Sequence, residues 1–243
     1  MKIQYMSDLH LEFDTMPVPD VAGDVLVLAG DIGVGVKHKD WVVACCEKHD
    51  NVIMILGNHE FYGSSMQKIR NAWAEMDMPN NFYFLDNDWV TINGVNFIGS
   101  TLWSHAHPLC PLNDFRLIKY KYPGGYGRFS TQEAKKLFNE NLDWLIKTVA
   151  KLSGHSNVVI THHAPSWKVQ DPKYAGEDSV VGSGFQTDIL HLFDPKDITA
   201  WVYGHTHYNT EFIEHGIFCT SNQRGYVGYG LADGFDPDKV IDI

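Results

Sequence analysis

The stretch of sequence that decides the fold spans positions 51–60 and reads Asn51-Val52-Ile53-Met54-Ile55-Leu56-Gly57-Asn58-His59-Glu60. After its first residue, the run 51–56 is continuously apolar and rich in β-branched side chains, which predicts a buried strand. A glycine and three polar residues follow, so we expect the strand to end there. A buried strand that leads directly into polar side chains is typical of the sheet edge where open α/β folds bind ligands.

The same arrangement, an apolar run with a polar ending, recurs along the chain. Strands are predicted at 2–7, 24–29, 157–161 and 198–203, and they lead into Asp8-Leu9-His10, Gly30-Asp31, His162-His163 and Gly204-His205-Thr206-His207. Helices are predicted at 36–50 and 64–76, and a capping box at 130–133 opens another helix with one apolar face. Strands that alternate with helices predict an α/β layered fold.

The remaining segments are shorter or irregular. Short strands are predicted at 82–85, 90–92 and 95–98, with Asn93-Gly94 as a hairpin turn, and two closing strands within 211–221. The stretches 103–128 and 166–184 show no clear periodicity, and irregular segments of this length inside a compact domain are usually functional loops or caps. We therefore expect one domain over residues 1–243, with cap-like loops at these two places.

The polar residues at the predicted strand ends form a candidate metal site. They are Asp8, His10, Asp31, Asn58, His59, His162, His205 and His207. Each motif alone is usually a turn or a pair of surface residues. Because every one of them stands at the end of a predicted strand, we expect their side chains to meet at one place in the fold. Carboxylate, imidazole and amide side chains form a mixed N/O ligand set suited to Mn, Fe, Zn or Ni. In Asp-x-His and His-x-His, an extended backbone would place both ligands on one side.

Composition limits the partners. The formal charge of −11 and the lack of a Lys/Arg cluster argue against a general nucleic-acid binder. They do not exclude a phosphate substrate, because bound metal ions dominate the local field of a site. The cysteines show no CxxC spacing, so a disulfide framework is not expected. Without a signal-peptide pattern or an apolar run of membrane-spanning length, we expect a cytoplasmic protein that does not enter a membrane.

Taken in order, these motifs resemble the pattern of the calcineurin-like metallophosphoesterase superfamily. That pattern is Asp-x-His, Gly-Asp, Gly-Asn-His-[Asp/Glu], His and Gly-His-x-His, and here it runs from residue 8 to residue 207. The resemblance implies an α/β fold that is a four-layer α/β/β/α sandwich, in which two mixed sheets are flanked by helices. It places the site at one end of the two sheets.

The resemblance also implies a role for each residue. One metal ion would be held by Asp8, His10, Asp31 and His207, and a second by Asp31, Asn58, His162 and His205. Asp31 would bridge the ions, and His162 is preferred to His163 because the family ligand usually comes directly at the strand end. A hydroxide between two divalent ions, Mn²⁺ and/or Fe with Zn²⁺ or Ni²⁺ as alternatives, would attack the phosphorus. His59 would face the leaving group as general acid or transition-state stabiliser.

Two further segments resemble a bacterial branch of small phosphoesterases in this superfamily. Residues 220–226 look like its Asn-Pro-Arg-Gly-Tyr segment, with Gln223 in place of proline, and residues 113–116 resemble the same branch. These segments add candidate substrate-binding residues, which are Asn222, Arg224, Asp114 and Arg116. His105 and His107 also have the two-residue spacing, but we expect them to be solvated loop residues.

The chain departs from two other branches. It lacks the second Asp and the Arg of Gly-Asp-x-x-Asp-Arg-Gly, which argues against a phosphoprotein substrate. It has Asn58-His59-Glu60 where lipid A pathway hydrolases usually have Asn-Arg-Asp. The sequence therefore predicts a metal-dependent hydrolase of a small or nucleotide-like phosphodiester or phosphomonoester. The alternatives are a nuclease or end-processing phosphatase on nucleic acid, and a catalytically weak interaction scaffold.

Overall fold

The structure, a computed structural model, describes residues 1–172 and 179–243. Its first sheet has the strand order β15-β1-β2-β3-β4. β1 to β4 run parallel, and β15 closes one edge in the antiparallel direction. The strands are β1 (Lys2–Met6), β2 (Val25–Ala29), β3 (Val52–Ile55), β4 (Phe82–Phe84) and β15 (Val240–Asp242).

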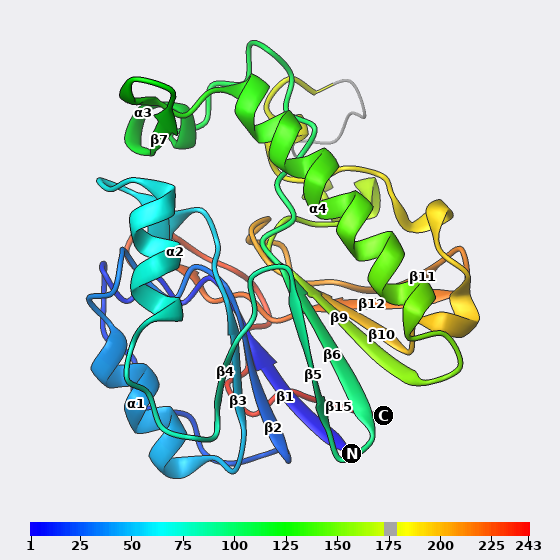
Figure 1. The fold of residues 1–243 in the computed structure, drawn as a ribbon. Helices are drawn as coiled ribbons and strands as arrows, with labels where there is room; N and C mark the ends of the chain where they lie inside the picture. Colours follow the sequence, from blue (N-terminus) through cyan, green and yellow to red (C-terminus); the bar gives the residue numbers. More distant parts are fainter. Residues whose placement is uncertain (173–178) are drawn as a thin grey trace.

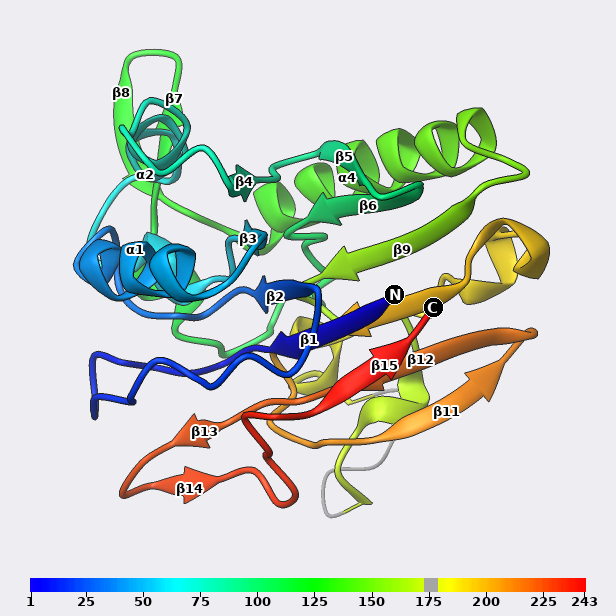
Figure 2. The same ribbon diagram turned by 90° about the horizontal axis from the view of Figure 1, so that it is seen from below.

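The second sheet has the order β11-β12-β10-β9-β6-β5. Its inner strands are parallel, and β5 and β11 are antiparallel edges. The strands are β5 (Asp88–Ile92), β6 (Val95–Ser100), β9 (Ser156–Thr161), β10 (Ala200–Tyr203), β11 (Glu211–Glu214) and β12 (Ile217–Ser221). Both sheets are therefore mixed, and Figure 2 shows them from below.

Helices cover the outer faces of the two sheets. α1 (Lys39–Lys48) and α2 (Met66–Ala74) lie beside the first sheet, and the long α4 (Thr131–Lys151) lies on the opposite side of the molecule (Figure 1). Two sheets packed face to face between helix layers make the predicted α/β/β/α sandwich, which is confirmed. Both termini lie at the end of the sheets opposite to α3 (Asp114–Leu117).

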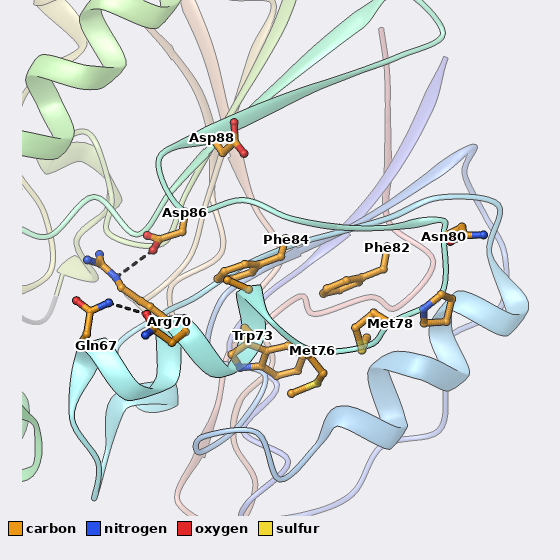
Figure 3. Close-up of a pocket in the computed structure, with 13 residues that line it drawn as sticks. Gln67, Arg70, Trp73, Met76, Met78, Asn80, Phe82, Phe84, Asp86 and Asp88 are labelled. Atoms are coloured by element: carbon orange, nitrogen blue, oxygen red, sulfur yellow. Dashed lines mark hydrogen bonds and ion pairs between the residues drawn. The ribbon is translucent and has the colours of Figure 1, made fainter.

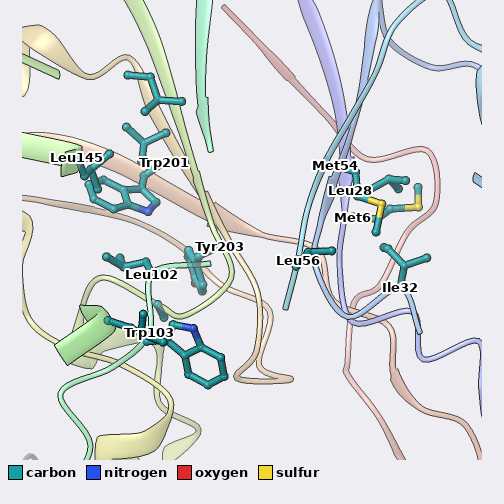
Figure 4. Close-up of a cluster of buried hydrophobic side chains, with 14 of the residues drawn as sticks. Met6, Leu28, Ile32, Met54, Leu56, Leu102, Trp103, Leu145, Trp201 and Tyr203 are labelled. Atoms are coloured by element: carbon teal, nitrogen blue, oxygen red, sulfur yellow. The ribbon is translucent and has the colours of Figure 1, made fainter. Parts of the chain in front are cut away.

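Alternating side chains of the buried strands supply two apolar layers. One layer lies between the sheets and includes Ile3, Tyr5, Val25, Val27, Ile53, Ile55, Phe97, Val158, Ile160 and Val202. The intervening residues face the helices. Figure 4 shows Leu28 and Met54 on one side and Trp201 with Leu145 of α4 on the other. Because both faces of each inner strand are covered, the runs are apolar without alternation, as the sequence indicated.

Local signals in the sequence were accurate where they rest on backbone chemistry. Asn93 and Gly94 both have positive φ, at 48° and 83°, as a two-residue hairpin turn requires. Ser130 caps α4, and its hydroxyl accepts a hydrogen bond from the backbone N–H of Glu133. All four cysteines are free and buried. Within the described residues, no helix is long and apolar enough to cross a membrane.

The expectation of an irregular segment at 103–128 was wrong in part. It contains α3 and a hairpin of β7 (Lys119–Tyr122) and β8 (Gly125–Arg128), in which no strand residue is fully buried, so the apolar run of a core strand is missing. Very short strands, β13 (Gly225–Tyr226), β14 (Gly230–Leu231) and β15, were also missed. The segment 166–184 contains the 3₁₀ turns Trp167–Val169 and Gly182–Gly184. Residues 173–178 of that predicted cap lie outside the described residues.

Further 3₁₀ turns occur in the part of the chain that the structure describes. They span His59–Phe61, Leu190–Leu192 and Pro195–Asp197. The first of them follows β3 after the short link 56–58 and begins with the predicted catalytic histidine.

Candidate metal centre

The predicted ligands meet at one end of the two sheets. β1, β2 and β3 of the first sheet and β9 and β10 of the second each end just before one of the polar motifs. Because parallel strands share the direction of their carboxyl ends, the loops that follow them open at the same edge. Residues that are up to two hundred positions apart in the sequence therefore become neighbours.

The first group of side chains contains Asp8, His10 and His207. The Nε2 atoms of His10 and His207 are 3.0 Å apart, and Asp8 Oδ1 is 3.3 Å from Nε2 of His207. Asp31 Oδ2 lies 3.8 Å from Nε2 of His10. Two imidazole nitrogens and two carboxylates thus face a common point.

The second group contains Asp31, His162 and His205. Nε2 of His162 is 3.4 Å from Asp31 Oδ2 and 3.0 Å from Asn58 Oδ1. Burial and the neighbouring histidines hold the pKa of His205 well below its usual value, so this ring is neutral. Asp31 is thus adjacent to both groups of side chains.

The spacing of these atoms fits a metal ligand set. Metal–ligand distances of about 2.0–2.2 Å place neighbouring ligand atoms about 3.0–3.6 Å apart. The separations above, apart from that between Asp31 and His10, fall in this range. In addition, Nδ1 of His162 is 3.0 Å from the carbonyl oxygen of Ala29, so the proton belongs on Nδ1 and the Nε2 lone pair faces the group. The donor set and its orientation therefore suit divalent cations.

The backbone around these residues is not extended, contrary to the expectation from the two-residue spacing. The residues Asp8, His10, Asp31, His205 and His207 have φ values of 52°, 46°, 53°, 72° and 50°. These values lie in the left-handed region, which non-glycine residues rarely adopt. The strands end before the ligands, and strained turns aim the side chains inward, as is common at functional sites.

Two glycines let the loops approach closely. A Cβ on Gly57 would lie 2.6 Å from Cε1 of His162 and even closer to Asp31 Oδ1. Gly30 has φ of +88°, and a Cβ there would lie 2.6 Å from Nδ1 of His162. Both positions therefore require glycine for the second group to assemble.

Glu60 fixes the loops that carry Asp31 and Asn58. Its buried carboxylate accepts hydrogen bonds from the backbone N–H groups of Asp31 at 3.1 Å, Ile32 at 2.8 Å and Gly57 at 2.7 Å. These contacts join the ends of β2 and β3. Glu60 is part of the Gly-Asn-His-Glu motif, but nothing local in the sequence indicates that it binds the backbone of these two loops.

His59 lies beside the first group and has partners on both ring nitrogens. Nδ1 is 2.8 Å from Glu12 Oε1, and Nε2 is 3.0 Å from the hydroxyl oxygen of Tyr226. Burial would lower the pKa of His59, but the Asp31 and Glu12 carboxylates outweigh it and raise the pKa. The contribution of Glu12 was missed from the sequence, although it directly follows the first motif as Asp8-Leu9-His10-Leu11-Glu12.

Comparisons with known proteins agree with this geometry. The sequence profile described as calcineurin-like phosphoesterase matches residues 1–209. The chain belongs to this family. An uncharacterised protein of Acanthamoeba polyphaga mimivirus is 28% identical over 278 residues, covering 99% of this chain and 96% of its own. A UPF0046 protein of Caenorhabditis elegans is 30% identical over 122 residues, covering 45% of this chain and 40% of its own.

A solved structure has the same fold. The phosphopantetheinyl hydrolase of Mycobacterium tuberculosis superposes with a TM-score of 0.66 at 17% identity, covering 93% of this phosphoesterase and 89% of that chain. At this identity the likeness concerns the fold alone, and it supports the two-sheet architecture described above.

In this phosphoesterase, Asp114 of α3 reaches the second group. Its Oδ1 accepts hydrogen bonds from Asn58 Nδ2 at 2.8 Å and from the Tyr62 hydroxyl at 2.7 Å. Asn58 therefore turns its amide nitrogen toward Asp114 and its oxygen toward His162. Asp114 thus lies within the site as a partner of Asn58, whereas Arg116, on the same short helix, is exposed.

The side chains of the other two substrate-binding candidates, Arg224 and Asn222, bind other parts of the protein. The Arg224 guanidinium donates to the carbonyl oxygens of Leu9 and Asp14 and pairs with the Asp14 carboxylate at 3.1 Å. The amide of Asn222 donates to the carbonyl oxygens of Tyr5 and Asp236. Both side chains therefore fasten loops of the fold, which argues against the substrate contacts predicted for them.

The remaining histidines separate clearly. His163 is buried, with Nδ1 3.2 Å from the carbonyl oxygen of Thr101, and burial together with His162 lowers its pKa to about 3. His162, rather than His163, lies against Asp31 and Asn58, whereas His163 groups with Asp114 and His205, so the choice of His162 as the ligand stays a prediction. His105 and His107 are exposed, as expected for loop residues.

A cavity of about 370 Å³ opens beside the ligand groups. Its described lining includes Asn58, His205 and His207 on the metal side, and Tyr62, Phe185, Tyr226, Tyr229, Leu112 and Leu231 on the walls. A larger hollow of about 730 Å³ lies between α2 and β4, with Trp73, Phe82 and Phe84 along it and an Arg70–Asp86 ion pair at one end (Figure 3). None of the predicted ligands lines that hollow, whereas Asn58, His205 and His207 line the smaller cavity.

Proposed function

We propose that this phosphoesterase hydrolyses phosphodiesters or phosphomonoesters of small, nucleotide-like alcohols, using two divalent cations. The observation that carries the proposal is the position of Asp31. Its carboxylate lies between the first group, Asp8, His10 and His207, and the second group, Asn58, His162 and His205. A shared carboxylate between two mixed N/O ligand sets is suited to a pair of ions.

In this proposal, Mn²⁺ and/or Fe occupies both groups, with Zn²⁺ or Ni²⁺ as alternatives, since the donors are imidazole, carboxylate and amide. When bound, the ions supply a water nucleophile of lowered pKa and positive charge that offsets the charge developing on the phosphoryl oxygens. Burial of nearly all the ligands keeps bulk water away from this charge, which strengthens electrostatic interactions.

The protein's own side chains orient and protonate the substrate. Asp114 fixes the Asn58 amide, and Glu60 fixes the loop that carries Asp31. His59 is held by Glu12 at Nδ1, and its Nε2 lies 3.0 Å from the hydroxyl of Tyr226, a residue that lines the cavity, so His59 is placed to supply the proton that a departing oxygen needs. General acid catalysis of this kind contributes about 10²–10⁴-fold.

The cavity supports a small substrate. Its volume of about 370 Å³ is in the range of small-molecule sites, and its aromatic walls can contact a base or another flat group. The formal charge of −11 argues against the nuclease alternative, because nucleic-acid affinity depends on Lys/Arg contacts to phosphates. The scaffold alternative requires an inactive site, whereas here the ligands and His59 are assembled. We propose a small-molecule phosphoester as the partner, with nucleic acid and membranes not involved.

The test is a hydrolysis assay with purified protein and Mn²⁺ on bis-p-nitrophenyl phosphate and p-nitrophenyl phosphate. We expect Asp31→Asn to abolish turnover of at least one of them. His59→Ala is assayed on diphenyl phosphate and phenyl phosphate, whose leaving group needs a proton, and we expect it to abolish turnover of at least one of these two esters. The matched controls are Asp40→Asn and His105→Ala, which change exposed residues of the same types. Activity that survives both site substitutions, or wild-type protein that is inert with every divalent ion, contradicts the proposal.

A further inference from the structure

We propose that the proton reaches the leaving group through a hydrogen-bonded chain of Glu12, His59 and Tyr226, with the Tyr226 hydroxyl as the group that contacts the departing oxygen. This inference rests on the proposed function and names a catalytic residue, Tyr226, and a positioning residue, Glu12. It differs from the expectation that His59 itself faces the leaving group.

The position of Tyr226 carries the inference. Among the described residues, Tyr226 lines the cavity beside the ligands, whereas His59 does not and is only 6% exposed. The Tyr226 hydroxyl oxygen is 3.0 Å from Nε2 of His59, so it stands between that nitrogen and the cavity. The Tyr226 ring also lies against His10 and His207, with centroids 4.3 and 4.5 Å away. The phenol is thus positioned over the first ligand group.

Glu12 determines which ring nitrogen of each neighbouring histidine carries a proton. A single oxygen, Oε1, lies 2.8 Å from Nδ1 of His59 and 3.2 Å from Nδ1 of His10. A carboxylate can only accept, so both rings carry a proton on Nδ1. This leaves Nε2 of His10 for the ligand group and Nε2 of His59 for Tyr226. One carboxylate therefore orients a metal ligand and the catalytic histidine together, as outer partners of metal-binding histidines commonly do.

The proton transfer accompanies the departure of the leaving group. The P–O bond to the leaving group breaks, and its electron pair stays on the leaving oxygen, which takes the proton of the Tyr226 hydroxyl. The phenol oxygen receives the Nε2 proton of the His59 imidazolium in the same step. His59 is left neutral, with its Nδ1–H still donating a hydrogen bond to Glu12, and its Nε2 regains a proton from solvent.

The experiment compares leaving groups in Tyr226→Phe, which keeps the ring and removes the hydroxyl. With Mn²⁺, kcat is measured on two pairs: bis-p-nitrophenyl and diphenyl phosphate, and p-nitrophenyl and phenyl phosphate. Nitrophenolate departs without protonation, whereas the more basic phenolate needs a proton. We expect kcat on a phenyl ester to fall about 10²-fold or more, and kcat on its nitrophenyl partner to stay within about threefold. Tyr126→Phe, an exposed tyrosine on β8, is the matched control and should match wild type.

Glu12→Gln tests the positioning role. We expect the same selective loss on phenyl esters together with Mn²⁺ affinity weakened about 10–100-fold by calorimetry, because His10 loses its partner. Tyr226→Phe should leave Mn²⁺ affinity unchanged. Asp14→Asn removes a charge from the same loop without reaching either imidazole, and it should keep both the selectivity and the affinity of wild type.

The outcomes separate the two proposals. A wild-type protein inactive on all four esters refutes the proposed function. An active wild type whose Tyr226→Phe variant loses equal activity on both members of a pair, or none on the phenyl ester, overturns the relay. Thermal unfolding of each variant shows whether it is folded. If Tyr226→Phe is unfolded, the leaving-group selectivity of Glu12→Gln decides: its presence supports the relay, and its absence overturns it.

Discussion

The substitution Gly57→Ala should damage the metal centre in a way that can be worked out from the backbone. A Cβ at position 57 would lie 2.6 Å from Cε1 of His162, where an ordinary contact is at least 3.4 Å, so the His162 ring must move by about 0.8 Å. Asp31 Oδ1 lies closer still and must move farther. Overpacking of this kind costs about 1–3 kcal/mol of stability. Misplacement of about 1 Å can cost about 10²-fold in catalysis.

We therefore expect Gly57→Ala to bind Mn²⁺ at least about tenfold more weakly in calorimetry and to lose about 10²-fold in kcat/KM. Gly154→Ala is the control, because Gly154 has φ of +83° with nothing near its added Cβ. That variant should lose about 1 kcal/mol of stability in urea while keeping its metal affinity. If Gly57→Ala bound Mn²⁺ like wild type and kept activity within about twofold, the assigned role of the close approach in the ligand geometry would be refuted.

Three other perturbations have equally direct readouts. Burial would lower the pKa of His162, but the Asp31 carboxylate raises it to about 10 in the metal-free protein. A metal ion must then displace about one proton from His162, so metal affinity should rise about tenfold for each unit by which the pH increases, up to that pKa. Calorimetric binding enthalpies that do not vary with the buffer would contradict this release of a proton. Asp114→Ala frees the Asn58 amide and should weaken Mn²⁺ binding about 10–100-fold, whereas Asp40→Ala, at an exposed position, should not. Equal Mn²⁺ affinities of Asp114→Ala and wild type would disprove the role of Asp114. Trp201→Ala leaves a cavity at a fully buried position and removes the hydrogen bond from Nε1 to the Thr161 hydroxyl. The free energy of unfolding in urea should therefore fall by about 3–5 kcal/mol, and a fall of less than about 1 kcal/mol would be inconsistent with the core described.

Much of the fold could be predicted because its signals are local. The runs at 24–29 and 51–56 are apolar on both faces, and the structure buries every residue of β2 and β3. The hairpin β7–β8 and the short strand β15 could not be predicted, because their pairing depends on distant partners and their side chains show little burial pattern. The extent of a single domain over 1–243 stays a prediction, as do the assigned ligand roles.

The sequence by itself determined which residues lie at strand ends, and so which carboxylates and imidazoles could meet. This works because strand length, apolar burial and glycine turns are properties of consecutive residues. Only the tertiary structure decided the second layer of contacts. These contacts join residues that are distant in the chain or separated by a turn of unusual φ. They are the contacts of Glu12 with His10 and His59, of Tyr226 with His59, of Asp114 with Asn58, and of Arg224 with the 9–15 loop. Hydrogen-bond partners depend on distance and direction in space, and periodicity along the chain carries neither.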